Sequence, residues 1–176
     1  MDEIVFLKAV QQYVSSIAIG ASSLRNLGAK GVVGKAREFL ASLDLVALKR
    51  MSPNQYADWL NERTAELKAR FPREARKWGA ARKALNIFLC HAYLNRPLCE
   101  AYRLERLDHV METPLDSVVA KKLREAAKGN LPRWPGVGRL TQEVSQQYQD
   151  FAAEHAKKCG VPRGCLDAVL WERQVS

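Results

Sequence analysis

The chain has 176 residues, of which 47% are hydrophobic and 27% charged, so it can bury one core and lacks the bias of a disordered protein. No apolar run approaches the ~20 residues that span a bilayer. The acidic Asp2 and Glu3 stand where a secretory signal would be basic. We therefore expect one cytoplasmic domain over residues 1–176, without a membrane partner.

The charge balance favours a polyanionic partner. Lys and Arg number 28 against 19 Asp and Glu, which gives a net charge of +9 and a pI of about 9.6. Nucleic acid is the first candidate for such a chain and an anionic membrane surface the second. Basic charge also serves solubility, so it does not identify the partner by itself.

The cysteines and histidines give no metal-binding pattern. No two cysteines have C-x-x-C spacing, and the three histidines are scattered. Cys159 and Cys165 flank a turn and could approach each other, but we expect reduced thiols. The sequence thus predicts neither a metal nor another cofactor.

Helical periodicity and helix start and stop signals predict an all-α fold, a compact bundle of about seven or eight helices. The clearest start is Ser52, an N-cap residue followed by Pro53 at the first helical position. The segment 20–34 holds four glycines and predicts turns. The expected helices cover residues 2–19, 34–48, 53–71, 80–94, part of 97–112, 117–128, 142–158 and 165–173.

A basic turn leads into the most apolar helix. Residues 72–79 are rich in Arg and Lys, whereas 80–94 are nearly all apolar, which predicts a buried central helix. The free N–H groups and the positive end of the helix dipole at such a start form a phosphate site. The predicted DNA contacts are Arg76, Lys77, Trp78, Gly79 and Arg82.

Two short segments carry a resemblance to a known family. The stretch Gly79-Ala-Ala-Arg-Lys83-Ala-Leu-Asn-Ile-Phe-Leu and the stretch Pro114-Leu-Asp116-Ser-Val-Val resemble the catalytic segments of the helix-hairpin-helix DNA glycosylases. Their order and wide separation resemble the archaeal 8-oxoguanine glycosylase branch, which includes prokaryotic antiphage glycosylases. The resemblance implies a helix-hairpin-helix core, with Lys83 and Asp116 as the catalytic pair. Ala81 and Val118 depart from the family pattern, which has glycine and histidine there.

The same resemblance implies a base-binding pocket. An aspartate four residues before a tryptophan helps to hold the flipped base in that branch, and Asp167 and Trp171 are similarly placed. Arg25 and Asn26 match the polar residues that an N-terminal glycine-containing segment supplies. Trp171 and Trp78 are candidates to stack on the base. The iron–sulfur loop of the endonuclease III group is missing, since the C-terminal part of the chain has two cysteines instead of four.

A second segment, 131–141, resembles the phosphate-binding hairpin through its Pro-Gly-Val-Gly run. No lysine follows in the next turn, and the helix after it is strongly polar on one side. Asp150 lies in the middle of that helix, where the family aspartate would open a helix of its own. We therefore prefer residues 79–89 as the catalytic segment and keep 131–141 as a possible DNA contact.

The chemistry explains why these residue types are needed. A glycosylase extrudes the target base from the duplex, and breaking the N-glycosidic bond builds positive charge on the sugar. The Asp116 carboxylate would stabilise that charge. Lys83 would attack C1′ and form a Schiff base, which permits strand cleavage. Partial burial and the positive end of its own helix would lower the pKa of Lys83, whereas a nearby Asp116 would raise it, so the sequence leaves AP lyase activity open.

We thus expect a monomeric glycosylase acting on double-stranded DNA with a modified base, in phage defence or base-excision repair. The base would be a hypermodified phage cytosine or 8-oxoguanine, two substrates that the resemblance leaves open. One alternative is a non-catalytic DNA-binding or defence-associated protein on the same scaffold. A second alternative is a helical protein–protein adaptor. DNA binding that depends on salt separates the first alternative from the second.

Overall fold

The computed structural model describes residues 2–20, 23–24, 27 and 29–170. Within these ranges the chain is all-helical, with eight α-helices, five 3₁₀ turns and no strand, which confirms the predicted all-α class and number of helices. None of the described helices is long and apolar enough to cross a membrane. The α-helices are α1 (Glu3–Ala18), α2 (Val32–Ala41), α3 (Pro53–Arg70), α4 (Trp78–Leu94), α5 (Arg96–Tyr102), α6 (Ser117–Ala126), α7 (Gln142–Cys159) and α8 (Leu166–Leu170).

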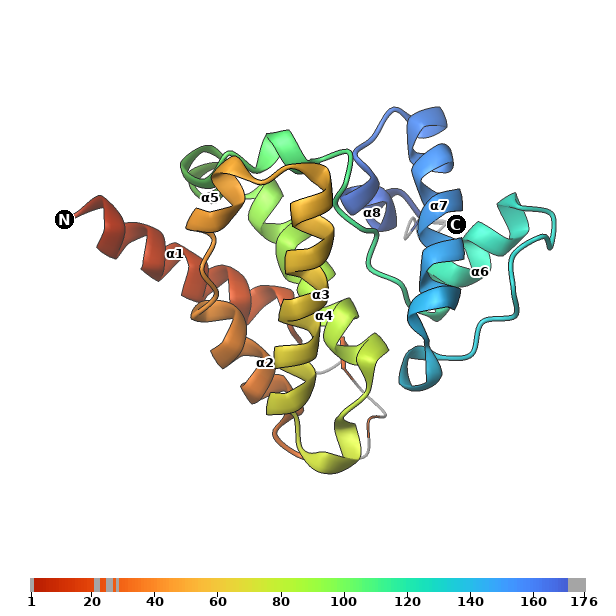
Figure 1. The fold of residues 1–176 in the computed structure, drawn as a ribbon, viewed down its shortest axis with the longest axis horizontal. Coiled ribbons are helices and arrows are strands. Elements are labelled where there is room, and N and C mark those ends of the chain that lie inside the picture. The colour runs from red at the N-terminus through yellow and green to blue at the C-terminus, as the bar shows by residue number, and fades with distance from the viewer. Residues whose placement is uncertain (1, 21–22, 25–26, 28, 171–176) are drawn as a thin grey trace, which may run out of the picture.

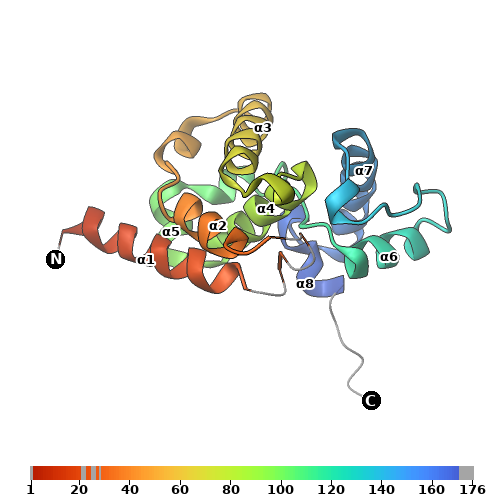
Figure 2. The same ribbon diagram turned by 90° about the horizontal axis from the view of Figure 1, so that it is seen from below.

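The helices form two groups with separate apolar cores. The N-terminal lobe contains α1 to α5, and its core extends from Val14 to Met111. The C-terminal lobe contains α6 to α8, and its core extends from Leu115 to Leu166. Figures 1 and 2 show the two lobes side by side, with α4 beside the C-terminal lobe and α6 at its outer edge. The chain passes between them at residues 111–115, directly before the Asp116 that begins α6.

Local signals explain the best-predicted helices. At the start of α3, the Ser52 hydroxyl accepts from the Gln55 N–H and the Gln55 side chain accepts from the Ser52 N–H, so a capping box forms. Eleven residues of α4 are buried, as the apolar run 80–94 predicts. This burial fixes α4 as the central helix of the N-terminal lobe.

Two predicted helices have wrong boundaries. The helix expected over 34–48 starts at Val32 and ends at Ala41, and a 3₁₀ turn follows at Val46–Arg50. Asp44 accepts a hydrogen bond from the Val46 N–H (2.9 Å), which favours a turn over a continued helix. The start of α4 at Trp78 places Gly79 inside the helix instead of in the preceding turn.

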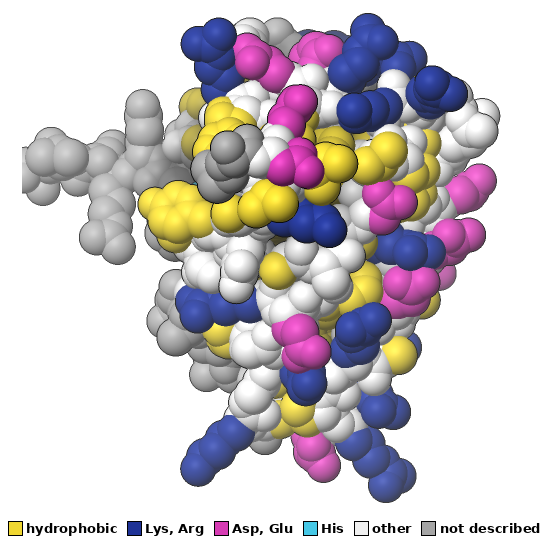
Figure 3. All heavy atoms as spheres, turned by 90° about the vertical axis from the view of Figure 1, so that its left-hand side faces the viewer, with side chains coloured by type: hydrophobic (Ala, Val, Ile, Leu, Met, Phe, Trp, Pro, Cys, Tyr) yellow, Lys and Arg dark blue, Asp and Glu magenta, His cyan; other side chains and the backbone are white. Residues whose placement is uncertain are grey.

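The face of the N-terminal lobe seen in Figure 3 mixes Lys and Arg with acidic and apolar side chains. Several apolar residues of α1 are exposed, among them Ile4 and Tyr13 at 62% and 63%. Basic residues on this face form no continuous stripe (Figure 3). The arrangement therefore favours no single anionic partner here, and the site described next lies at the junction of the lobes.

Candidate functional site

A hollow with a volume of about 600 Å³ lies where the two lobes meet. Lys83 from α4, Asp116 from the start of α6 and Asp167 from α8 all line it. The loop 134–139 and the end of α1 form further walls. Three of the predicted site residues, far apart in the sequence, are thus brought together around one cavity.

Lys83 and Asp116 form an ion pair. The Nζ of Lys83 lies 3.7 Å from Oδ2 of Asp116, and the two side chains are only 10% and 18% exposed. The other oxygen, Oδ1, accepts from the N–H groups of Val118 (2.9 Å) and Val119 (3.0 Å), so Asp116 caps α6. The cap fixes the carboxylate with one oxygen on the helix and the other toward the lysine.

Buried hydrogen bonds hold the segment before Asp116. The side-chain amide of Gln149 accepts from the Thr113 N–H (2.9 Å) and donates to the Thr113 carbonyl (2.8 Å). The Thr113 hydroxyl donates to the Arg163 carbonyl (2.6 Å), and the Arg163 guanidinium donates to the carbonyls of Met111 (2.7 Å) and Val110. Since α7 and the turn Arg163–Cys165 together satisfy these donors and acceptors, the backbone leading to Asp116 has little freedom to move.

A second set of contacts ties the same segment to α4. The Asn86 side chain donates to Oε2 of Glu112 (3.0 Å), and Nε of Arg82 lies 3.6 Å from the same oxygen. Arg82 also donates to the side chain of Asn61, and its guanidinium lies 4.9 Å from the Trp78 ring centre. These contacts set the spacing between α4, which carries Lys83, and the turn that precedes Asp116.

Arg82 was predicted to contact DNA, but its side chain lies in the protein interior. It is 4% exposed, and burial lowers its pKa while the Glu112 carboxylate opposes that shift. A buried guanidinium that is engaged by Glu112 and Asn61 is a structural link between helices and is not presented to a DNA phosphate.

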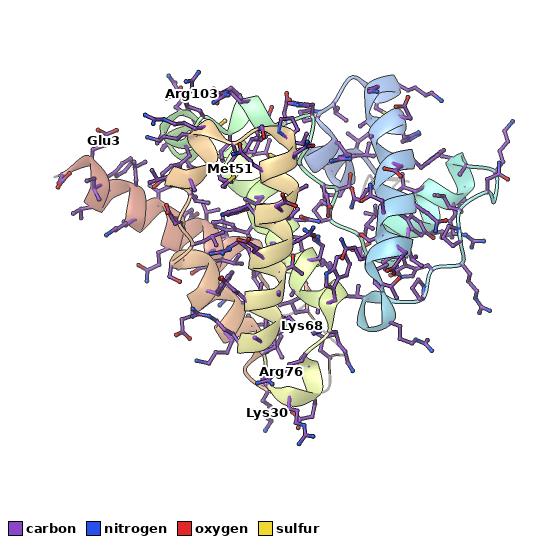
Figure 4. All side chains as sticks on the ribbon, viewed as in Figure 1. Glu3, Lys30, Met51, Lys68, Arg76 and Arg103 are labelled. Carbon is purple, nitrogen blue, oxygen red and sulfur yellow. The ribbon has the colours of Figure 1, made fainter. Side chains whose placement is uncertain are left out.

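Gly79 is also buried, and its predicted DNA contact is covered by the protein itself. A Cβ at this position would overlap the Val137 carbonyl oxygen and lie 2.7 Å from the Leu140 Cβ. The glycine thus lets the first turn of α4 pack directly against residues 137–140. The remaining predicted DNA contacts are better exposed: Trp78 is half-buried, and Arg76 and Lys77 are exposed. Figure 4 shows Arg76 at the lower end of the molecule.

Asp167 is a partly buried acid at the edge of the pocket. Its Oδ1 is buried and has no hydrogen-bond partner in the protein. Burial raises the pKa of Asp167 to about 6; the nearby Asp116 adds to the shift and Lys83 opposes it. An oxygen of this kind suits a donor group on a ligand, and the protonated acid can itself donate.

Sequence reasoning missed part of the pocket wall. His91 lines the pocket two turns after Lys83 on α4, and burial lowers its pKa. The residues Trp134 to Arg139 form another wall, so the second hairpin-like segment lies at the same site as the first. His91 follows Lys83 by eight residues, which places the two side chains on the same face of a helix, and this spacing was the sequence signal that could have identified the histidine. The loop 134–139 had no such signal, because its place at the site depends on the contact with Gly79, which forms only in the tertiary fold.

Three predicted base-pocket residues, Arg25, Asn26 and Trp171, lie outside the described residues. The fourth predicted base-pocket residue, Asp167, lines the pocket. The loop 134–139 brings a different aromatic residue, Trp134, to the same hollow. Its ring packs edge-on against Tyr148 at 5.6 Å.

The sequence suggested that Cys159 and Cys165 could approach each other, but in the structure Cys165 lies beside Cys90. The Sγ atoms of Cys90 and Cys165 are 3.2 Å apart and both residues are buried, whereas Cys159 is exposed. The thiols are free. Their hydrogen bond raises the pKa of Cys90 and lowers that of Cys165. Over the described part of the chain, no cluster of three or more His, Cys, Asp or Glu side chains could hold a metal ion.

Comparison with protein-family models, with curated proteins and with solved structures finds no match to this chain. The function is therefore inferred from the geometry of the pocket and from the resemblance carried by the two short segments.

Proposed function

We propose that the protein is a DNA glycosylase that excises a modified base from double-stranded DNA. The observation that carries the proposal is the Lys83–Asp116 ion pair, at 3.7 Å, on the wall of a 600 Å³ pocket. The two residues belong to the segments that resemble the catalytic segments of the helix-hairpin-helix glycosylases. A pocket of this volume accommodates a flipped nucleotide, since small-molecule sites span about 300–1,000 Å³.

In the proposed reaction the N-glycosidic bond breaks and its electron pair leaves with the base. Positive charge then develops on the sugar, and the Asp116 carboxylate stabilises that charge. Since Oδ1 of Asp116 is held by two N–H groups of α6, the carboxylate needs no reorganisation during the reaction. Asp167, with a raised pKa and an unpartnered oxygen, would bind the edge of the base.

Two fates of C1′ follow from the state of Lys83. As an ammonium paired with Asp116, the lysine is no nucleophile, so water attacks C1′ and an abasic site results. Once the lysine loses its proton, its nitrogen can bond to C1′ and form a Schiff base, which then cleaves the strand by β-elimination. The ion pair favours base removal alone as the main activity.

The proposal is tested by counting abasic sites with an aldehyde-reactive probe. Purified protein is incubated with unmodified plasmid, with DNA containing 8-oxoguanine and with genomes of phages that carry modified cytosines. Abasic sites on one substrate with the wild type, and none with Asp116→Asn, would support the proposal and name the base class. No sites on any substrate, despite DNA binding, would favour the non-catalytic alternative. The class of base excised would also separate a role in repair from one in phage defence.

A further inference from the structure

A second hollow, of about 470 Å³, lies beside the candidate pocket on the outer side of α6. It is bounded by α6, by the turn after this helix and by Trp134. Ser117 and Trp134 line both hollows, so the second one is a continuation of the first. Figures 1 and 2 show α6 at the edge of the molecule, open to a large partner.

The second hollow has an excess of positive charge. Lys121, Arg124 and Lys128 line it, and Glu125 is the one acid among its described lining residues. Glu125 lies 3.9 Å from Lys121 in an exposed ion pair, with side chains 75% and 55% exposed for Lys121 and Glu125. Such a pair contributes little free energy and is screened by salt, so an anion can displace Glu125.

The hollow is built on fixed backbone. Nε of Arg124 donates to the Leu131 carbonyl at 3.4 Å, which ties α6 to the loop after it. Lys128 has a left-handed backbone, with φ of +51°, and the Gly129 N–H donates to the Arg124 carbonyl at 2.9 Å. A lysine is uncommon in this conformation, where glycine or asparagine is usual. The turn thus places a cation at a position where a neutral residue would be the ordinary choice.

We infer that this hollow binds the phosphodiester backbone of DNA next to the nucleotide that occupies the pocket. Three cations meet the charge of the phosphates, and the Trp134 ring and the lysine stems offer apolar surface to the sugars. Continuity with the pocket favours DNA over an acidic protein, because the neighbouring phosphate lies one nucleotide step from the extruded base. The identity of the pocket's occupant rests on the proposed function, whereas the charge of the hollow does not.

The test is the salt dependence of duplex DNA binding, measured by fluorescence anisotropy from 50 to 300 mM KCl. The variant is Lys121→Gln with Lys128→Asn, in which asparagine tolerates the left-handed backbone of Lys128. Each lost phosphate contact flattens the slope of log K against log[salt] by about 0.9. We expect the double variant to flatten the slope by about one to two units and to weaken binding at low salt.

The matched control is Lys157→Gln with Lys158→Gln at the end of α7. It removes the same charge, and Lys157 has an exposed ion pair with Glu154 just as Lys121 has with Glu125. The control should retain the wild-type slope. Equal slopes for the wild type and the Lys121/Lys128 variant, or equal flattening by both pairs, would overturn the inference.

Neutralising Glu125 should change DNA affinity in the opposite direction. Glu125→Gln releases Lys121 and should tighten DNA binding at low salt, whereas Glu154→Gln should leave it unchanged. The two proposals fail separately. A flattened slope in the Lys121/Lys128 variant, without excision by the wild type on any substrate, would support phosphate binding at the hollow and contradict the glycosylase activity. Excision by the wild type, with an unchanged slope in the variant, would support the glycosylase activity and contradict phosphate binding at the hollow.

Discussion

Lys83 and Asp116 approach within 3.7 Å although they belong to different helices and different lobes. Their meeting depends on two separate attachments. Asp116 is fixed by the start of α6, and the segment before it is held by Gln149 of α7 and by Asn86 of α4. The catalytic geometry that we propose is therefore a property of the interface between the lobes.

Asp116→Asn should abolish base excision while the protein still folds. Asparagine caps a helix about as well as aspartate, but Lys83 loses the counter-charge of a largely buried ion pair, so the free energy of unfolding should fall by on the order of 1 kcal/mol. The positive charge on the sugar would lose its counter-charge, and the rate should fall at least about 100-fold. Abasic-site counts and urea unfolding measure the two effects. Full activity of this variant would contradict the mechanism.

Lys83→Gln separates the two fates of C1′. If the lysine is a nucleophile, borohydride-trapped protein–DNA complexes disappear with this substitution. Lys158→Gln, at an exposed lysine near the end of α7 that is not a predicted DNA contact, is the control and should retain the trapped complexes. Trapping that survives in Lys83→Gln would mean that another amine attacks the sugar.

Gly79→Ala should destabilise the protein through a clash between the lobes. The added Cβ would overlap the Val137 carbonyl oxygen and Leu140, and overpacking of this kind costs about 1–3 kcal/mol. Gly34→Ala in α2 is the control, because a Cβ there meets nothing within 4 Å. The control should gain up to about 1 kcal/mol from helix propensity. Opposite signs in urea unfolding would confirm the contact, and a stabilised Gly79→Ala would exclude it.

Gln149→Leu should loosen the segment that carries Asp116. It leaves the Thr113 N–H and carbonyl without partners in the interior, and an unsatisfied buried group costs about 1–3 kcal/mol. The variant should therefore unfold at lower urea and excise more slowly at a temperature where it is folded. Gln146→Leu, on the exposed side of the same helix, should change the unfolding free energy by less than about 0.5 kcal/mol. Equal effects would argue against this anchoring role.

Local signals predicted most of the helices. The helix start at Ser52 and the apolar run of α4 are encoded within a few residues, and both were confirmed. The surroundings of Arg82 and Gly79 were missed because they depend on Glu112 and Val137, which reach α4 only through the tertiary fold. A basic residue in a basic segment gives no local sign that its guanidinium is buried.

The pH dependence of stability should reveal Asp167. Its pKa is about 6 in the folded protein against 3.8 in the unfolded chain, so the folded state binds the proton more tightly. Folding free energy is therefore lost as pH rises from about 4 to 6, and the loss is complete above pH 6.

Asp167→Asn should remove this loss and be more stable than the wild type at pH 8, by up to about 3 kcal/mol. The two proteins should converge near pH 4. Urea unfolding at pH 4, 6 and 8 measures the difference. A constant difference between Asp167→Asn and wild type across this range would mean that the carboxyl is not held in a desolvated site.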